Sequence, residues 1–221
     1  MAEPLVLGID TSGSVSVGLA RGGAVLARAT LHDRMAHVEQ LVPLIDRTLA
    51  EAELAVPDIE AVVVGLGPGP FTGLRVGIVS AQVLADVRGL PLHGVCSLDV
   101  IAAEHARAGG VDEFVVAADA RRREVYWARY AGDGSRLEGP QVGSPEEVPR
   151  LPTVGPGADL YPQRLTVAPG PRRLDPGVVA LHGLALPDAG REPLYLRRPD
   201  AAEPTRRKSV LHTAVLRGTV S

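Results

Sequence analysis

The sequence contains a single cysteine, Cys96, among its 221 residues. One cysteine excludes a disulfide within the chain and any cluster of thiolate metal ligands, and it is typical of a reducing compartment. The first ten residues, MAEPLVLGID, lack the basic segment and the apolar run of a signal peptide. Apolar runs elsewhere fall short of the roughly 20 residues needed to cross a bilayer. We therefore expect a cytoplasmic protein with no membrane contact.

Aromatic residues are also scarce, with one Trp, four Tyr and two Phe. The core must therefore be built from Val, Leu, Ile and Ala, and few rings are available to stack on nucleic-acid bases. The formal net charge is -3, which does not indicate a nucleic-acid surface held by the chain alone. We expect contact with nucleic acid only through a partner.

The first half of the sequence combines short apolar runs with helical periodicity. Three runs separated by hairpin-sized turns predict an antiparallel meander. Apolar residues then recur with a period of about 3.6, which predicts a helix that either starts shortly before Pro43 or bends there. The predicted strands are 5–10, 15–21, 24–31, 59–65 and 91–95, and the predicted helices are 36–54, 72–88 and 98–107.

This βββαβαβα order predicts an α/β protein. A three-strand meander extended by parallel crossovers is the ribonuclease-H-like half-domain of actin-like ATPases and sugar kinases. A second hairpin, at 114–119 and 124–131, predicts the beginning of a second half-domain. Nine prolines from Pro140 to Gly177 predict that this half is small and loop-rich.

The last part of the sequence predicts little regular structure. We expect one short helix near 177–186 and an extended piece at 194–197. The sequence after it carries a basic cluster, Arg206–Lys208. The predicted organisation is a half-domain at 1–108 that carries a partner interface, a smaller half-domain at 109–198, and a tail at 199–221.

Asp10 and Thr11 follow the first predicted strand, where actin-like kinases place an acidic group and a phosphate-binding hairpin. Asp119 follows the corresponding strand of the second half. The three residues predict a split nucleotide site with Mg²⁺. An equally good interpretation is that Asp10 and Thr11 merely cap a turn.

The glycine-rich segment from Gly65 to Gly73 resembles a phosphate-binding loop that leads into a helix. It matches neither the P-loop pattern nor G-x-G-x-x-G, and Pro68 and Pro70 lack the N–H groups that bind an anion. We therefore interpret this segment as a rigid turn.

The helix after this turn carries a stripe of small residues, Gly73, Gly77, Ala81 and Ala85, at every fourth position. Such a stripe allows another helix to approach closely. The approaching helix belongs either to the same subunit or to a partner, and we favour the partner. On this helix the predicted interface consists of Thr72, Gly73, Arg75, Gly77, Ser80, Ala81 and Leu84.

Motifs for metal ligation and hydrolysis are absent from the sequence. No two of its six histidines are spaced at i, i+4, as in H-E-x-x-H, and there is no G-x-S-x-G. Arg121–Arg123 predicts a solvated turn that contacts phosphate only if a partner brings RNA near it. These absences disfavour a metallopeptidase or a serine hydrolase.

Four motifs together give the chain a specific family resemblance. They are GIDTS at 8–12, GLGPGPFTGLRVG at 65–77, Asp119-Ala120-Arg121 with Val125-Tyr126, and PLYLR at 193–197. With these motifs, the chain closely resembles the TsaB (YeaZ) family over nearly its whole length.

The resemblance implies a non-catalytic dimerisation subunit of the bacterial machinery that makes threonylcarbamoyladenosine (t6A) beside the tRNA anticodon. It implies as partners a TsaD-like catalytic paralogue and a TsaE-like ATPase, with tRNA bound only through the complex, and it allows a homodimer. It also implies an interface built from the first two helices, about 37–54 and 72–88, which adds His37 and Leu41 to the predicted interface. ATP, Mg²⁺ and metal would belong to the partner subunits. The H-x-x-x-H spacing of TsaD is absent here. The alternative hypothesis is a small actin-like ATPase or phosphotransferase that uses Asp10 and Asp119.

Overall fold

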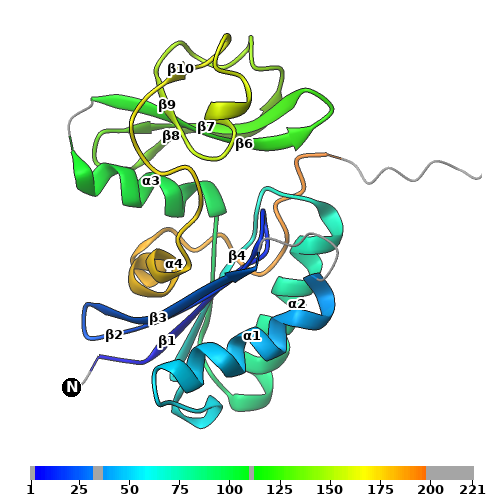
Figure 1. Cartoon of the computed structure of the whole chain (residues 1–221), viewed down its shortest axis with the longest axis vertical. Helices are drawn as coiled ribbons and strands as arrows, with labels where there is room; N and C mark the ends of the chain where they lie inside the picture. The colour runs from blue at the N-terminus through cyan, green and yellow to red at the C-terminus, as the bar shows by residue number, and fades with distance from the viewer. Residues whose placement is uncertain (1–2, 32–36, 110–111, 198–221) are drawn as a thin grey trace, which may run out of the picture.

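A computed structural model describes residues 3–31, 37–109 and 112–197 of the chain. Within these residues, ten strands form two five-stranded sheets, one in each half of the molecule (Figure 1). The first sheet consists of β1 (Val6–Asp10), β2 (Val15–Arg21), β3 (Ala24–Leu31), β4 (Ala61–Gly65) and β5 (Leu92–Val95), in the order β3-β2-β1-β4-β5.

The first sheet is mixed, as the predicted meander and crossovers require. β2 pairs antiparallel with β1 and β3, whereas β4 lies parallel to β1 and to β5. All five residues of β4 are buried, because helices cover both faces of this sheet. The predicted α/β class and the five strands of this half are confirmed.

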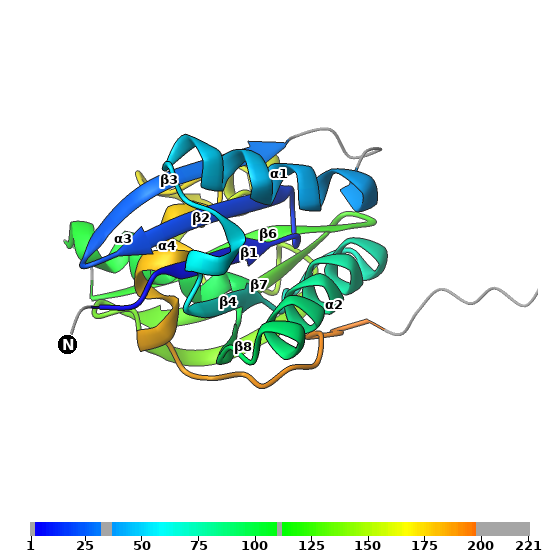
Figure 2. The same cartoon turned by 90° about the horizontal axis from the view of Figure 1, so that it is seen from below.

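Helices cover the two faces of the first sheet unequally. α1 (His37–Glu51) and α2 (Phe71–Arg88) lie side by side on one face, as Figure 2 shows from below. The short helix α4 (Pro176–His182) covers the other face. α1 begins at His37 and continues through Pro43, so the helix starts well before the proline.

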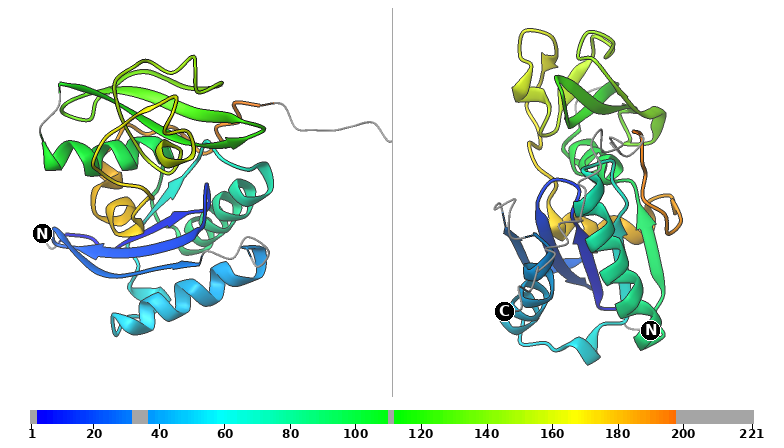
Figure 3. Two further views of the ribbon diagram at one scale, coloured as in Figure 1. Left: turned by 45° about the horizontal axis from the view of Figure 1, so that its top comes forward. Right: turned by 90° about the vertical axis from the view of Figure 1, so that its right-hand side faces the viewer.

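The second sheet contains β6 (Glu113–Arg121), β7 (Glu124–Ala131), β8 (Arg136–Gly143), β9 (Pro152–Val154) and β10 (Thr166–Val167), in the order β10-β9-β6-β7-β8. α3 (Ser97–Ala108) packs between this sheet and α4, so the two halves share an interface of helices (Figure 3). The buried core beneath the second sheet includes Phe114 and Tyr130. Three 3-10 helices complete the described chain: η1 (Val56–Asp58), η2 (Ala158–Leu160) and η3 (Gly183–Ala185).

Strand β8 was not predicted, because Gly139 and Pro140 interrupt its sequence. The structure accommodates both residues at the sheet edge, where β8 pairs only with β7 and the Gly139–Pro140 bond is cis. Proline is tolerated on an edge strand because no neighbour requires its missing N–H. The loop-rich second half is therefore more regular than the proline count indicates.

The chain returns to the first half after the second sheet. α4 packs on β1, β2 and β3, and the backbone N–H of Leu194 donates to the carbonyl of Leu66 at 2.8 Å. Residues 194–197 form no strand. The predicted boundaries 1–108, 109–198 and 199–221 remain predictions, and the tail with Arg206–Lys208 lies outside the described residues. No described helix is long and apolar enough to cross a membrane.

Candidate functional site

A cleft of about 900 Å³ lies where the two halves meet. It is lined by the ends of β1 and β6, the β1–β2 turn, the start of α3 and the segment before α4. Asp10 and Asp119, which the sequence places far apart, both line it. The fold therefore brings together the two carboxylates predicted for a nucleotide site.

Asp10 is buried, and both of its carboxylate oxygens are already occupied. Oδ1 accepts hydrogen bonds from the backbone N–H of Ser12 at 2.9 Å and from its hydroxyl at 2.7 Å. Oδ2 accepts from the hydroxyl of Ser97 at 2.5 Å. Burial raises the pKa of Asp10, and these three hydrogen bonds oppose the rise. Asp10 therefore joins β1 to the start of α3.

Asp119 is held by its own turn. Oδ1 accepts from the backbone N–H of Arg121 at 2.8 Å, and the guanidinium of Arg121 lies 3.3 Å from Oδ2. In this arrangement Asp10 is hydrogen-bonded to Ser12 and Ser97, and Asp119 is paired with Arg121. Both carboxylates predicted for the nucleotide site therefore have partners within the chain.

The turn from Arg121 to Arg123 has an unusual backbone. All three residues have positive φ angles, of 63°, 52° and 63°. The left-handed region costs a non-glycine residue about 1–2 kcal/mol, because Cβ approaches the following carbonyl oxygen. Such a conformation persists where surrounding structure holds it, and it is enriched at ligand sites. The turn presents three exposed arginines at the tip of the β6–β7 hairpin.

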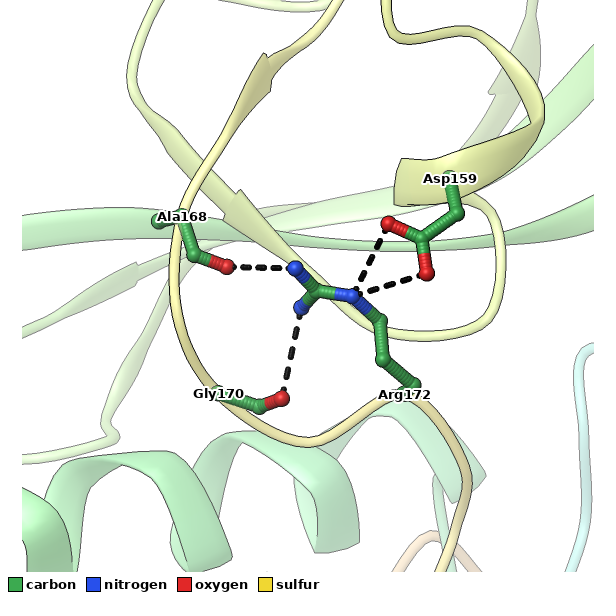
Figure 4. Close-up of polar contacts among 4 residues, drawn as sticks. All are labelled: Asp159, Ala168, Gly170 and Arg172. Carbon is green, nitrogen blue, oxygen red and sulfur yellow. Dashed lines mark hydrogen bonds and ion pairs between the residues drawn. The ribbon is translucent and has the colours of Figure 1, made fainter.

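Arg172 holds the loop that forms one wall of the cleft (Figure 4). Its Nε lies 3.0 Å from both carboxylate oxygens of Asp159. The guanidinium also donates to the carbonyls of Ala168 at 2.7 Å and Gly170 at 3.3 Å. Arg172 therefore organises its own loop and is not a ligand-binding arginine in this arrangement.

The glycine-rich turn before α2 packs tightly against the β1–β2 turn. The N–H of Gly67 donates to the Ser97 hydroxyl at 3.2 Å, and a Cβ at Gly69 would lie 2.6 Å from the carbonyl oxygen of Ser12. The Gly67–Pro68 bond is cis. This packing agrees with a rigid turn, because protein backbone occupies the space beside Gly69.

The small-residue stripe of α2 faces the core of its own subunit. Gly77, Ala81 and Ala85 are buried, and a Cβ at Gly77 would collide with the Oγ1 of Thr11. The prediction that this stripe points toward a partner is wrong, because β1 and the β1–β2 turn approach there. Val79 on the same helix is exposed.

The other residues of the predicted interface separate into two groups. Leu41 is fully buried in the core, so its side chain is not available to a partner. Thr72 and Arg75 are exposed, and Gly73, Ser80 and Leu84 are partly exposed. The side chain of His37 lies outside the described residues. The structure therefore keeps part of the predicted face and removes Leu41, Gly77 and Ala81 from it.

A row of valines occupies the outer face of α2. Val79, Val83 and Val87 are 52%, 55% and 79% exposed, at i, i+4 and i+8. Val42 on the neighbouring helix α1 is 60% exposed. The sequence shows this spacing, but spacing alone does not tell whether the valine row or the glycine and alanine stripe faces outward. We call Val42, Val79, Val83 and Val87 the valine face.

An aromatic pair lies at the beginning of α2. The rings of Phe71 and Tyr195 stack with centroids 4.6 Å apart, and the guanidinium of Arg75 lies 5.2 Å from the centre of the Phe71 ring. A smaller hollow of about 180 Å³ beside them is also lined by Arg121 and Arg122. Nothing in the sequence predicted the stack, because its two rings are 124 positions apart (195 − 71).

Comparison with known proteins assigns the chain to a family. The family model described as TsaD, tRNA N6-adenosine threonylcarbamoyltransferase, matches residues 25–168. An uncharacterized protein of Mycobacterium tuberculosis is 43% identical over 89% of this chain and 93% of its own length. The tRNA threonylcarbamoyladenosine biosynthesis protein TsaB of Escherichia coli is 40% identical over 58% of this chain. The chain belongs to the TsaB (YeaZ) family.

The solved structure of YeaZ from Pseudomonas aeruginosa extends the TsaB/YeaZ likeness to the fold. It superimposes with a TM-score of 0.68 at 28% identity, over 87% of this chain and 100% of that chain. A second Pseudomonas structure, described as similar to peptidase YeaZ, gives a TM-score of 0.72. The chain spans 55% of the length of E. coli TsaB and 56% of that of a Mycobacterium leprae relative.

Proposed function

We propose that this TsaB-family chain is a non-catalytic scaffold subunit for the synthesis of t6A in tRNA. In this role it binds a TsaD-type catalytic subunit and supports a TsaE-type ATPase, while tRNA is bound by the assembled complex. The names of the TsaB relatives support the pathway. The exposed valine face is the observation that carries the scaffold role.

The valine face has the character of a protein-binding surface. Three exposed side chains on α2 form an apolar row at every fourth position, and Val42 on the neighbouring helix α1 is exposed as well. A row at every fourth position is one of the ridges that pack into the groove of another helix. Solvent-exposed apolar rows on paired helices are typical of sites where a second protein binds. The same face also suits a homodimer when the TsaD-type subunit is absent.

The cleft supports a non-catalytic role. A Mg²⁺–nucleotide site needs open carboxylate oxygens, and those of Asp10 accept hydrogen bonds from Ser12 and Ser97. Asp119 is paired with Arg121. These contacts within the chain support a contribution to the reaction through assembly rather than through nucleotide chemistry.

Reconstitution with purified TsaD-type and TsaE-type subunits tests this proposal. Formation of t6A should require this chain, while the chain alone should neither hydrolyse ATP nor modify tRNA. Val83→Glu should abolish co-purification with the TsaD-type subunit and reduce t6A formation at least about tenfold, because a charge at a packed apolar site costs more than about 1.4 kcal/mol.

The matched control is Leu137→Glu. Leu137 is 47% exposed on β8, away from α1 and α2, so this variant should bind the TsaD-type subunit normally. Both variants should keep the wild-type melting temperature within a few degrees, because both side chains are exposed. Normal complex formation by Val83→Glu would overturn the interface, and ATP turnover by the isolated chain would overturn the non-catalytic role.

A further inference from the structure

The aromatic pair at the start of α2 is unusual for a chain with so few aromatic residues. Phe71 and Tyr195 are 37% and 39% exposed, whereas Phe114, Trp127 and Tyr130 are buried. The exposed rings are stacked at an interplanar angle of 24°. Both residues are therefore partly exposed, and their rings stay aligned with one face of each ring turned to the other.

Arginines lie beside this aromatic pair. Arg75 lies over the Phe71 ring, and Arg121 and Arg122 line the hollow that Phe71 and Tyr195 also line. Arg197 lines the same hollow and is paired with Glu124. Four arginines therefore gather beside the aromatic pair in a chain whose net charge is -3.

We propose that Phe71, Arg75, Arg121, Arg122 and Tyr195 form a binding site for single-stranded RNA. An unpaired base stacks on the aromatic pair, and the arginines bind the adjacent phosphates. Stacking on a ring and ion pairing with arginine are the two interactions by which proteins bind unpaired nucleotides. This inference deepens the proposed function, because a tRNA-modifying complex must hold an unpaired loop of its substrate.

The charge of the site favours RNA over a protein partner. Arginine and tyrosine are frequent in protein interfaces as well, but there they surround an apolar centre. The valine face supplies such an apolar surface on the outer face of α2, whereas here arginines line the hollow beside the rings. The left-handed backbone of residues 121–123 keeps the arginine turn at the edge of this hollow.

Tyr195 is not required to hold its own segment in place. The Gln82 side chain donates to the carbonyl of Arg191 at 2.8 Å, and Leu194 N–H donates to Leu66. Arg197 donates to the carbonyl of Ala120 at 2.8 Å. The backbone on both sides of Tyr195 is therefore anchored by other contacts, so Tyr195→Leu removes the stacking ring and leaves the segment attached.

The test uses the assembled complex and a fluorescein-labelled RNA hairpin with an unpaired loop. The dissociation constant is measured by fluorescence anisotropy at several salt concentrations for wild type, Tyr195→Leu, Arg122→Glu and the control Arg150→Glu. Arg150 is an exposed arginine that lines neither the cleft between the two halves nor the hollow beside the aromatic pair. Tyr195→Leu should weaken binding about tenfold with an unchanged salt dependence, because it removes stacking only.

Arg122→Glu should weaken binding and reduce the salt dependence by about one released counterion, whereas Arg150→Glu should bind as wild type does. Wild-type affinity in both Tyr195→Leu and Arg122→Glu would overturn the site. If Tyr195→Leu and Arg122→Glu no longer co-purified with the TsaD-type subunit but bound RNA with unchanged affinity, the RNA site would also be overturned, because these residues would then form a protein-binding surface. A wild-type chain that is not needed for t6A formation would instead reject the proposed function, so the two failures are distinguishable.

Discussion

The hydroxyl of Ser97 donates a hydrogen bond to Oδ2 of Asp10 across 87 positions of the sequence, at a distance of 2.5 Å. Ser97 is the first residue of α3 and Asp10 is the last residue of β1. The same hydroxyl accepts from the N–H of Gly67 at 3.2 Å. One buried serine therefore holds three segments together at the cleft, where a nucleotide-binding protein would keep its acidic group open.

Ser97→Ala should destabilise the fold. The variant removes the donor to Oδ2 of Asp10 and the acceptor for the Gly67 N–H, which leaves two buried polar groups without these partners. Loss of a buried hydrogen bond to a charged group costs about 1.5–3 kcal/mol. Urea denaturation at neutral pH measures the change. An unfolding free energy equal to that of wild type would show that this contact does not stabilise the cleft.

The effect of Ser97→Ala should also depend on pH. Burial raises the pKa of Asp10 above its ordinary value of 3.8, so the folded state favours the protonated carboxyl. The contribution of Asp10 to the unfolding free energy is therefore largest at low pH, and it decreases as the pH rises through the folded-state pKa of Asp10. The Ser97 hydrogen bond opposes this rise in pKa. The difference in unfolding free energy between Ser97→Ala and wild type should therefore widen from about pH 4 to pH 7. A constant gap would argue against an effect through the ionised carboxylate.

Gly77→Leu should destabilise the subunit itself. Any side chain at this position meets Thr11, whose Oγ1 is buried and has no hydrogen-bond partner among the described residues. Overpacking a closed core costs about 1–3 kcal/mol. The comparison is with Val79→Leu on the exposed side of α2, which should change stability by less than about 0.5 kcal/mol. Equal thermal midpoints for the two variants would contradict the inward orientation of the glycine.

His105 should make the fold sensitive to acid. Its ring is 6% exposed, packs edge-on against Phe114 at 4.6 Å, and has no hydrogen-bond partner on either nitrogen among the described residues. Burial, and secondarily the charge of Arg172, lowers the pKa of His105 below 6.5. The contribution of His105 to the unfolding free energy is therefore fully present above pH 6.5, and it is lost as the pH falls through the folded-state pKa of His105.

The measurement is the urea midpoint at about pH 7.5 and about pH 5 for wild type and His105→Gln. The wild-type midpoint should fall further than that of the variant, because only wild type must protonate this buried ring. His182 also has a lowered pKa, through burial and then Arg107, so some pH dependence should remain in the variant. Identical pH profiles for the two proteins would count against His105 as the source.

Sequence patterns determined most of the first half of this fold. The short apolar or alternating runs that form β1 to β3 and the uninterrupted apolar run of β4 identify strands, because buried strands leave a local hydrophobic pattern in the sequence. β8 escaped prediction because a proline is compatible with a strand only at a sheet edge, and edge position is a tertiary property. The motifs at residues 8–12 and 65–77 also identified the TsaB/YeaZ family from sequence alone.

Only the tertiary structure decided which side chains are available to act. The spacing along α2 gives two rows, one of glycine and alanine and one of valine, and spacing cannot say which row faces the sheet. The approach of Thr11 to Gly77 fixes the small row inward and leaves Val79, Val83 and Val87 outside. Likewise, the sequence located Asp10, but its partner Ser97 is distant in sequence. Contacts between distant segments leave no local period, so only the folded chain reveals them.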